Sequence, residues 1–199
     1  MCGIAGAIWW DAAKSVSPET LQRMTTSLQH RGPDADGHYC WPHASDHAGA
    51  LPGVALGHRR LSIIDVAGSA QPLGNEDDSI QIVFNGEIYN YRELRTQLLA
   101  AGHTFRTDGD TEVIVHLYEQ HGLDFVQHLR GMFALAIWDS RERRLVLVRD
   151  RLGKKPLYFR KEDGRLLFGS ELKALLQVPG VPRQLNHQAV LQFLTLQYI

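Results

Sequence analysis

The first six residues, Met1-Cys2-Gly3-Ile4-Ala5-Gly6, place a cysteine directly behind the initiator methionine. Because methionine is usually excised before a small side chain, processing would leave Cys2 with a thiol and a free α-amino group. A thiol with a pKa of about 8.5 is mostly protonated at neutral pH, and an α-amine with a pKa of about 8 can take up its proton. Cys2 is therefore a candidate nucleophile with its own base. The alternative is that it packs as a small buried hydrophobe at the start of a strand.

The residues after the cysteine predict a strand and then a helix. Residues 3–10 are small or apolar without helical spacing, which is typical of a strand buried on both faces. Ser17 is the expected N-cap of a helix with Pro18 in its first turn. Its apolar stripe is Leu21, Met24 and Leu28.

The next segment alternates between loop and strand signals. Residues 41–53 are rich in His, Ala, Gly and Pro and predict an exposed loop. Two short strands are predicted at residues 54–56 and 61–64, with basic residues between them. Residues 80–84 alternate in polarity and predict a strand that ends in a turn at Asn85-Gly86.

The second half predicts helices followed by hairpins. Asn90 and Asp110 are candidate N-caps, and Gly102 and Gly122 are candidate C-terminal stops. Residues 132–138 and 145–148 predict one hairpin, and residues 156–159 and 166–168 predict a second that turns around Asp163-Gly164. Two helices are predicted after them, at residues 172–176 and 189–196. Helices grouped between hairpins favour an α+β fold of stacked sheets and helices.

Composition excludes several classes of protein. The 199 residues are 44% hydrophobic and 22% charged, close to the globular average, and the net charge of -1 favours neither nucleic acid nor an anionic membrane as a partner. The two cysteines, Cys2 and Cys40, are too few for a disulfide framework and favour a reducing, cytoplasmic location. The histidines lack metal-ligand spacing and no glycine-rich phosphate loop is present, so neither a metal nor a cofactor is expected in this chain.

Five motifs occur in unbroken order along the chain: Met1-Cys2-Gly3-Ile4, His30-Arg31-Gly32-Pro33-Asp34, Arg60-Leu61-Ser62-Ile63, Asn85-Gly86-Glu87-Ile88-Tyr89-Asn90 and Asp108-Gly109-Asp110-Thr111-Glu112-Val113. Together they resemble the glutaminase domain of the class II glutamine amidotransferases, most closely that of the glutamine-hydrolysing asparagine synthetases. The resemblance implies the N-terminal nucleophile hydrolase fold, a four-layer αββα sandwich with two antiparallel sheets.

The resemblance also implies roles for individual residues. Cys2 would attack the amide carbon of glutamine, and the Asn85 side chain with the Gly86 N–H would form the oxyanion hole. Arg60 would bind the α-carboxylate of glutamine and Asp110 its α-ammonium group. The rest of the substrate pocket would be Glu87 and the wall Leu61, Ser62, Ile63 and Ile64. Taken alone, Asn85-Gly86 favours a hairpin turn, Arg60 a surface residue and Asp110 a helix cap.

The family resemblance implies a domain division and further partners. We expect residues 1–177 to be the glutaminase domain and residues 178–199 the start of a linker or synthetase domain, whose remainder would be covalently linked and would bind ATP, magnesium and aspartate. A homodimer stays open. So do two other functions: a class II amidotransferase with another acceptor, and a non-catalytic glutamine-sensing module that retains Met1.

Overall fold

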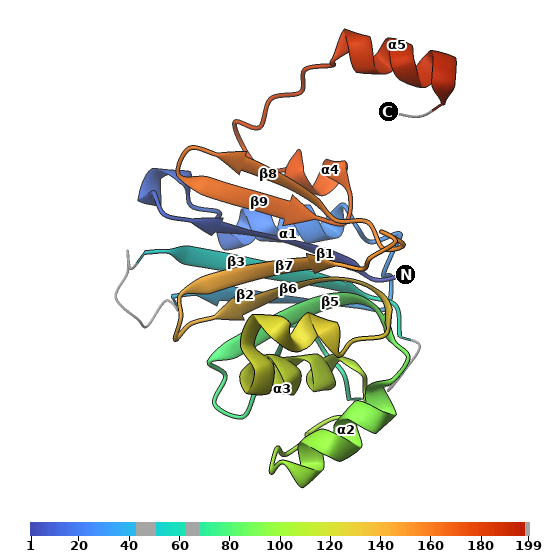
Figure 1. The fold of residues 1–199 in the computed structure, drawn as a ribbon. Helices are drawn as coiled ribbons and strands as arrows, with labels where there is room; N and C mark the ends of the chain where they lie inside the picture. Colours follow the sequence, from blue (N-terminus) through green and yellow to red (C-terminus); the bar gives the residue numbers. More distant parts are fainter. Residues whose placement is uncertain (43–50, 63–67, 198–199) are drawn as a thin grey trace.

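The computed structural model describes residues 1–42, 51–62 and 68–197. Two antiparallel sheets face each other, with helices on their outer sides (Figure 1). The first sheet has the order β2-β3-β1-β9-β8 and comprises β1 (Gly3–Trp9), β2 (Ala35–Trp41), β3 (Gly53–Arg60), β8 (Tyr158–Glu162) and β9 (Arg165–Gly169). The second has the order β4-β5-β6-β7 and comprises β4 (Leu73–Gly74), β5 (Ile80–Ile88), β6 (Gly131–Asp139) and β7 (Arg144–Arg149).

Helices complete the four layers. The first sheet is covered by α1 (Pro18–Thr26) and α4 (Leu172–Leu175), and the second by α3 (Thr111–His121), on which α2 (Tyr91–Ala100) packs. Short 3-10 turns are η1 (Ala12–Lys14) and η2 (Gly122–Gln127). The helix, strand and hairpin order confirms the predicted α+β arrangement.

The first strand and first helix form where the sequence predicts them. Every residue of β1 from Gly3 to Ala7 is buried, as a strand covered on both faces requires. Ser17 Oγ accepts a 3.3 Å hydrogen bond from the Thr20 N–H at the start of α1, and the predicted stripe of Leu21, Met24 and Leu28 is fully buried.

Strand β3 differs from the prediction of two short strands. It is one strand from Gly53 to Arg60, paired with β1 through Gly3↔Arg59 and with β2 through Ala35↔Arg60. Pairing on both sides extends the strand through its basic residues, which the local sequence pattern does not predict. Residues 61 and 62 lie outside a strand, and Ile63 and Ile64 lie outside the described residues.

Strand β5 also corrects a prediction, because it does not turn at Asn85-Gly86. It continues to Ile88 and pairs with β6 through Asn85↔Ala134 and Gly86↔Phe133. Glycine is required here by close packing, since a Cβ on Gly86 would lie 2.3 Å from the Met132 carbonyl oxygen. The pair of residues therefore lies within a central strand, where its orientation is fixed by β6.

Two predicted helix caps occupy the right positions but bond elsewhere. Asn90 precedes α2, yet its Nδ2 donates to the His128 carbonyl and its Oδ1 accepts from the Arg130 N–H, at 2.9 and 3.0 Å. Asp110 precedes α3 and makes no side-chain cap either. Gly102 and Gly122, with φ of 100° and 56°, end the two helices as predicted.

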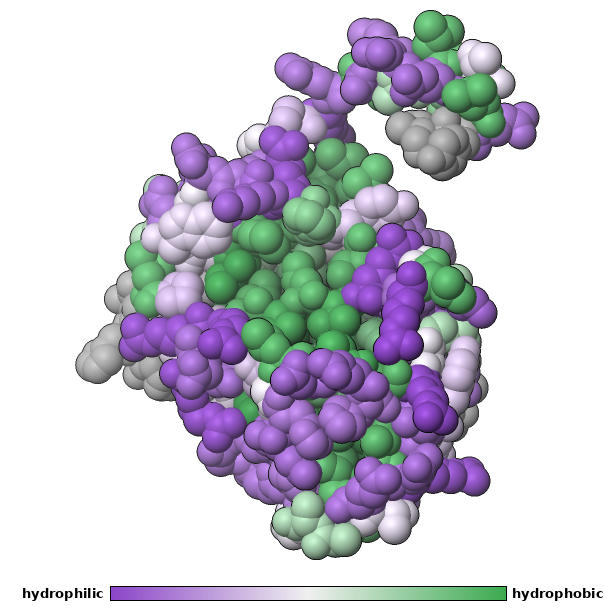
Figure 2. Space-filling model, viewed as in Figure 1, coloured by the Kyte–Doolittle hydropathy of each residue, from purple (hydrophilic) through white to green (hydrophobic). Residues whose placement is uncertain are grey.

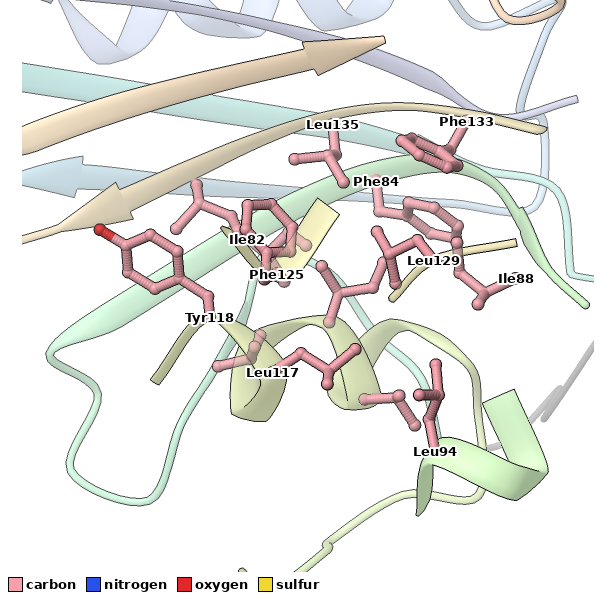
Figure 3. Packing of buried hydrophobic residues seen from close by; sticks show 14 of the residues in the cluster. Ile82, Phe84, Ile88, Leu94, Leu117, Tyr118, Phe125, Leu129, Phe133 and Leu135 are labelled. Carbon is pink, nitrogen blue, oxygen red and sulfur yellow. The ribbon is translucent and has the colours of Figure 1, made fainter. Parts of the chain in front are cut away.

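The hydrophobic core lies in three layers, one between the sheets and one beneath each helical layer. Figure 3 shows the layer under α3, where Phe84 and Leu135 of the sheet face Leu117 and Phe125. Complete burial of a side chain of this size contributes about 1.5 to 3 kcal/mol, so this layer holds α3 firmly against β5. The N-terminus of α3 is thereby fixed beside the end of the central strand.

The last helix stands apart from the sandwich. Helix α5 (His187–Leu196) follows an extended segment and lies away from the body of the molecule (Figure 1). Its apolar residues Leu191, Phe193, Leu194 and Leu196 are exposed. Figure 2 shows further hydrophobic residues gathered at the centre of the face of the sandwich that is turned to the viewer. Within the described segments, no helix has the length and apolar character that crossing a bilayer requires.

Candidate active site

A cavity of about 110 Å³ opens at the ends of the central strands of both sheets. Its lining brings together residues from distant parts of the chain: Met1, Cys2, Arg60, Leu61, Ser69, Gln71, Phe84, Asn85, Gly86, Glu87, Asp110, Thr111, Met132 and Lys155. Most of the residues predicted for the site are in this set. Ser62 is not in it.

Cys2 lies directly before β1, at the end of the central strand of the first sheet. Its side chain is half-buried, and its Sγ accepts a hydrogen bond from the Leu61 N–H at 3.3 Å. The Leu61 carbonyl oxygen lies 3.6 Å from the same sulfur and can accept the thiol proton. The thiol is therefore positioned by backbone groups while Met1 is still attached.

The segment His30 to Asp34, for which the sequence predicts no chemical role, holds the backbone of Cys2. Arg31 Nε donates to the Cys2 carbonyl oxygen at 3.0 Å, and Arg31 Nη1 lies 3.1 Å from Glu171 Oε1. Although partial burial acts in the opposite direction, hydrogen bonds from Arg31, His30 and Lys173 lower the pKa of Glu171 to about 2. The Glu171 carboxylate therefore stays ionised through the neutral pH range, and so keeps its contact with Arg31, which in turn holds the Cys2 carbonyl oxygen.

Asn85 provides a hydrogen-bond donor inside the cavity. The residue is 1% exposed, and within the described part of the chain its Nδ2 is one of the few buried side-chain atoms with no hydrogen-bond partner. A buried donor left unpaired costs about 1 to 3 kcal/mol. Such a cost is expected where a donor is reserved for a ligand or a transient charge.

His58 connects the two sheets behind this donor. Its Nε2 lies 3.1 Å from the Phe84 carbonyl oxygen, one residue before Asn85. Burial lowers the pKa of His58 to about 3, against the effect of this hydrogen bond. His58 is therefore neutral at physiological pH, with Nε2 carrying the proton that it donates to Phe84.

Arg60 and Leu61 line the cavity at the end of β3. Asp34 brackets this segment, because its N–H donates to the Arg60 carbonyl at 3.0 Å and its Oδ2 accepts from the Ser62 N–H at 2.8 Å. Ser62 thus supports the wall through its backbone. Ile63 and Ile64, predicted for the same wall, lie outside the described residues.

Asp110 supplies a carboxylate at the N-terminus of α3. It is 7% exposed, and its Oδ2 accepts a 2.9 Å hydrogen bond from the Ile88 N–H. Burial raises the pKa of Asp110 to about 6, and the nearby Glu87 carboxylate adds to the increase. A cationic group in the cavity would stabilise the ionised form of both acids.

Several lining residues carry no signal in the sequence. Gln71 accepts from the Phe84 N–H at 2.6 Å and donates to Thr111 Oγ1 at 3.2 Å, joining β5 to α3. Lys155 is buried in the cavity wall, in a loop whose N–H groups converge on Asp150. These residues were missed because tertiary packing alone brings them to the site.

The combination of groups defines what the cavity can do chemically. It holds a thiol, an unpaired amide donor, a guanidinium group and two carboxylates. The arrangement suits attack on an amide or ester carbonyl in a small molecule that carries one positive and one negative charge. These groups come from both sheets: Cys2 directly precedes β1 of the first sheet, and Asn85 lies in β5 of the second.

Comparison with known proteins places this geometry in context. Residues 1–199 match the family model described as a glutamine amidotransferase domain. Glutamine-hydrolyzing asparagine synthetase 2 of Bacillus subtilis (strain 168) is 44% identical over 193 residues, which cover 96% of this chain and 24% of that protein. Glutamine-hydrolyzing asparagine synthetase 3 of Arabidopsis thaliana is 40% identical over 176 residues, covering 88% of this chain and 28% of that protein. The chain therefore spans only about a quarter of the length of these curated relatives.

A solved structure confirms the fold. Glutamine phosphoribosylpyrophosphate amidotransferase from B. subtilis, complexed with ADP and GMP, superposes with a TM-score of 0.67 at 23% identity, over 88% of this chain and 43% of that chain. With the two facing antiparallel sheets and their outer helices, this likeness confirms the predicted four-layer αββα sandwich.

Proposed function

Because the chain belongs to the glutamine amidotransferase domain family, we propose that it hydrolyses glutamine to glutamate and ammonia with Cys2 as the nucleophile. The observation that carries the proposal is the convergence of the Cys2 thiol, the unpaired Asn85 amide and the charged groups Arg60 and Asp110 on one small cavity. Removal of Met1 frees the α-amine that accepts the thiol proton.

The reaction then proceeds in two steps. The Cys2 thiolate attacks the side-chain amide carbon of glutamine, and the tetrahedral oxyanion accepts hydrogen bonds from Asn85 Nδ2 and the Gly86 N–H. The proton held by the α-amine passes to the departing nitrogen, and ammonia leaves a thioester on Cys2. Water, deprotonated by the same amine, hydrolyses the thioester and releases glutamate.

Recognition of free glutamine requires both of its backbone charges to be matched. Arg60 binds the α-carboxylate, for which a planar guanidinium group offers two parallel donors. Asp110, with Glu87 beside it, binds the α-ammonium group. The ammonium group also offsets the burial cost that raises the pKa of Asp110, so the substrate completes the electrostatics of the pocket. Leu61 lines this wall of the pocket, which Ile63 and Ile64 are proposed to extend.

The released ammonia is proposed to serve an asparagine synthetase. The relatives with this name are three to four times longer than the chain, which supports a longer protein with a further domain. We propose that this domain is covalently linked, binds ATP and magnesium and amidates aspartate, and that residues 178–199 begin the connection to it. An amidotransferase with another acceptor would share the glutaminase chemistry described here.

The decisive experiment compares the two cysteines. Cys2→Ala is expected to abolish ammonia release from glutamine, whereas Cys40→Ala keeps it, because Cys40 lies outside the cavity and burial raises the pKa of its thiol. Intact mass, measured on each protein, reports whether Met1 has been removed. Undiminished turnover in Cys2→Ala would refute the proposal. A processed wild-type protein that binds glutamine without releasing ammonia would favour the glutamine-sensing module instead.

A further inference from the structure

A second cluster of chemistry-bearing side chains lies on the outer helical layer, away from the cavity of the nucleophile. His116 and Glu119 belong to α3, His103 follows α2, and Glu76 follows β4. Ligand atoms of Glu76, His103 and His116 all lie within 4.8 Å of one another. None of these residues lines the catalytic cavity.

We propose that this cluster binds a divalent transition-metal ion of the Zn²⁺ class through Glu76, His103, His116 and Glu119. Two imidazoles and two carboxylates form a donor set that suits zinc. The ion would be a structural one, because four protein ligands fill a tetrahedral site and leave no position for a substrate.

The distances between the donor atoms fit such an ion. Donors about 2.1 Å from a tetrahedral metal lie about 3.4 Å from one another. His116 Nδ1 lies 2.9 Å from Glu119 Oε2 and 3.7 Å from Glu76 Oε2, and His103 Nδ1 lies 3.8 Å from the same Glu119 oxygen. These three distances bracket the expected value, and the ligand atoms of Glu76, His103 and His116 lie within 4.8 Å of one another, so the side chains must close around the ion.

Surrounding groups orient the two carboxylates toward a common point. Glu119 Oε1 accepts a 2.8 Å hydrogen bond from Asn75 Nδ2, which leaves Oε2 directed at the imidazoles. Glu76 Oε1 accepts from the N–H and the hydroxyl of Thr104, both at 3.4 Å, and Glu76 Oε2 is again the oxygen nearest His116. Each acid thus uses one oxygen for support and has the other for the metal.

The histidine at the centre is oriented in the same way. The side chain of His116 is 1% exposed, and its Nε2 has Glu112 Oε1 at 3.7 Å on the side opposite the cluster. Nδ1 donates a 2.9 Å hydrogen bond to Glu119 Oε2, so an ion bound at Nδ1 would take the place of this proton. Nδ1 is the atom that faces Glu76 and Glu119. The Glu76 side chain, 42% exposed, leaves a route for the ion from solvent.

The site would join three segments that are far apart in the sequence. It ties α3 to the chain after α2 and to the turn between β4 and β5. Because α3 carries Asp110 and Thr111 at its N-terminus, the ion would stabilise the helix that forms one wall of the catalytic cavity. The sequence gives no sign of this, since the ligand spacing corresponds to no metal motif.

Binding is tested with tag-free, metal-stripped protein titrated with ZnCl₂ in a calorimeter, and with CoCl₂ followed by visible absorption. His103→Gln and Glu76→Gln remove partly exposed ligands, so both variants are expected to fold. His187→Gln, which removes an exposed histidine of α5, is the matched control. MgCl₂ tests selectivity, because magnesium prefers an octahedral shell of oxygen atoms.

We expect one Zn²⁺ per chain in the wild type and in His187→Gln, a tetrahedral Co²⁺ spectrum, and a higher Tm with Zn²⁺. His103→Gln and Glu76→Gln should each bind Zn²⁺ at least about tenfold more weakly and lose the Tm increase. No binding, or the same affinity in both variants, would overturn the proposal. So would Zn²⁺ binding that is lost in a Cys2→Ser or Cys40→Ser variant, which would assign the ion to a thiol.

Discussion

The backbone N–H of Ile88 donates a 2.9 Å hydrogen bond to Oδ2 of Asp110, and so joins the end of β5 to the start of α3. Strand β5 carries the proposed oxyanion donors, whereas α3 carries the proposed ligand of the substrate ammonium group. The Asp110 carboxylate therefore fixes the distance between the proposed substrate-binding group at the start of α3 and the proposed oxyanion donors on β5. Under the proposed function, the same carboxylate would also bind the ammonium group of the substrate.

Asp110→Asn should stabilise the protein at alkaline pH. The pKa of Asp110 is about 6 in the folded state and about 3.9 in an unfolded chain, so between these values the folded state holds a proton that the unfolded state has lost. Stability contributed by the protonated form is therefore lost as pH rises through 6. Asparagine keeps an oxygen acceptor for Ile88 without the charge. Urea unfolding at pH 8 should show a gain of about 1 to 3 kcal/mol, shrinking toward zero near pH 4.

The same substitution should weaken glutamine binding, since the ammonium group loses its anion. For the wild type, the KM for glutamine should rise as pH falls below about 6, while Asp110→Asn should lose this dependence. A variant that is no more stable at pH 8 would contradict the burial argument. An unchanged KM would contradict the assignment of Asp110 to the substrate.

Arg60→Ala should raise the KM for glutamine by about ten- to a hundredfold, because a lost charged hydrogen bond costs about 1.5 to 3 kcal/mol. Arg60→Lys is the matched variant, which keeps the charge but loses the planar guanidinium group. Its KM should lie between those of the wild type and Arg60→Ala. Steady-state kinetics with saturating glutamine should show little change in kcat. If Arg60→Ala binds glutamine normally, Arg60 supports the cavity wall without contacting the substrate.

Asn85→Ala should lower kcat by about a hundredfold or more with little effect on KM, as removal of an oxyanion donor does. Asn90→Ala is the control, because Asn90 lies outside the cavity and its side chain bonds to backbone groups of His128 and Arg130. Its kcat should stay near that of the wild type. A loss confined to KM in Asn85→Ala would refute the oxyanion role.

Gly86→Ala should destabilise the fold and reduce activity together. The added Cβ would meet the Met132 carbonyl oxygen at 2.3 Å and the Phe133 Cα at 2.7 Å, both backbone atoms that cannot rotate away. Strands β5 and β6 must separate locally, which should cost about 1 to 3 kcal/mol in urea unfolding. Wild-type stability and kcat in this variant would show that the strands can move apart freely.

Local sequence signals predicted most of the elements. The apolar run after Cys2, the Ser17-Pro18 helix start and the glycine at Gly164 act over a few residues, so their structures follow from short-range rules. The site was predicted by motif resemblance, and the structure brings Cys2, Arg60, Leu61, Asn85, Gly86, Glu87 and Asp110 to one cavity.

Elements that depend on distant partners were not predicted. Strand β2 (Ala35–Trp41) is partly exposed at the sheet edge and lacks an alternating pattern, so only its pairing with β3 reveals it. Pairing likewise carries β3 through Arg60 and β5 through Asn85-Gly86, against their local turn and charge signals. For the same reason, the side chains of Asn90 and Asp110 bond to backbone groups distant in the sequence and do not cap the helices that they precede.

The link from Arg31 to the Cys2 carbonyl has a consequence for when the protein becomes active. Because the anchor holds the main chain of Cys2 and the Leu61 N–H holds its sulfur, neither depends on a free N-terminus. Under the proposed function, the thiol and its backbone contacts are thus in place before Met1 is removed. Cleavage of one peptide bond would then be enough to supply the α-amine, with no refolding of the chain around Cys2.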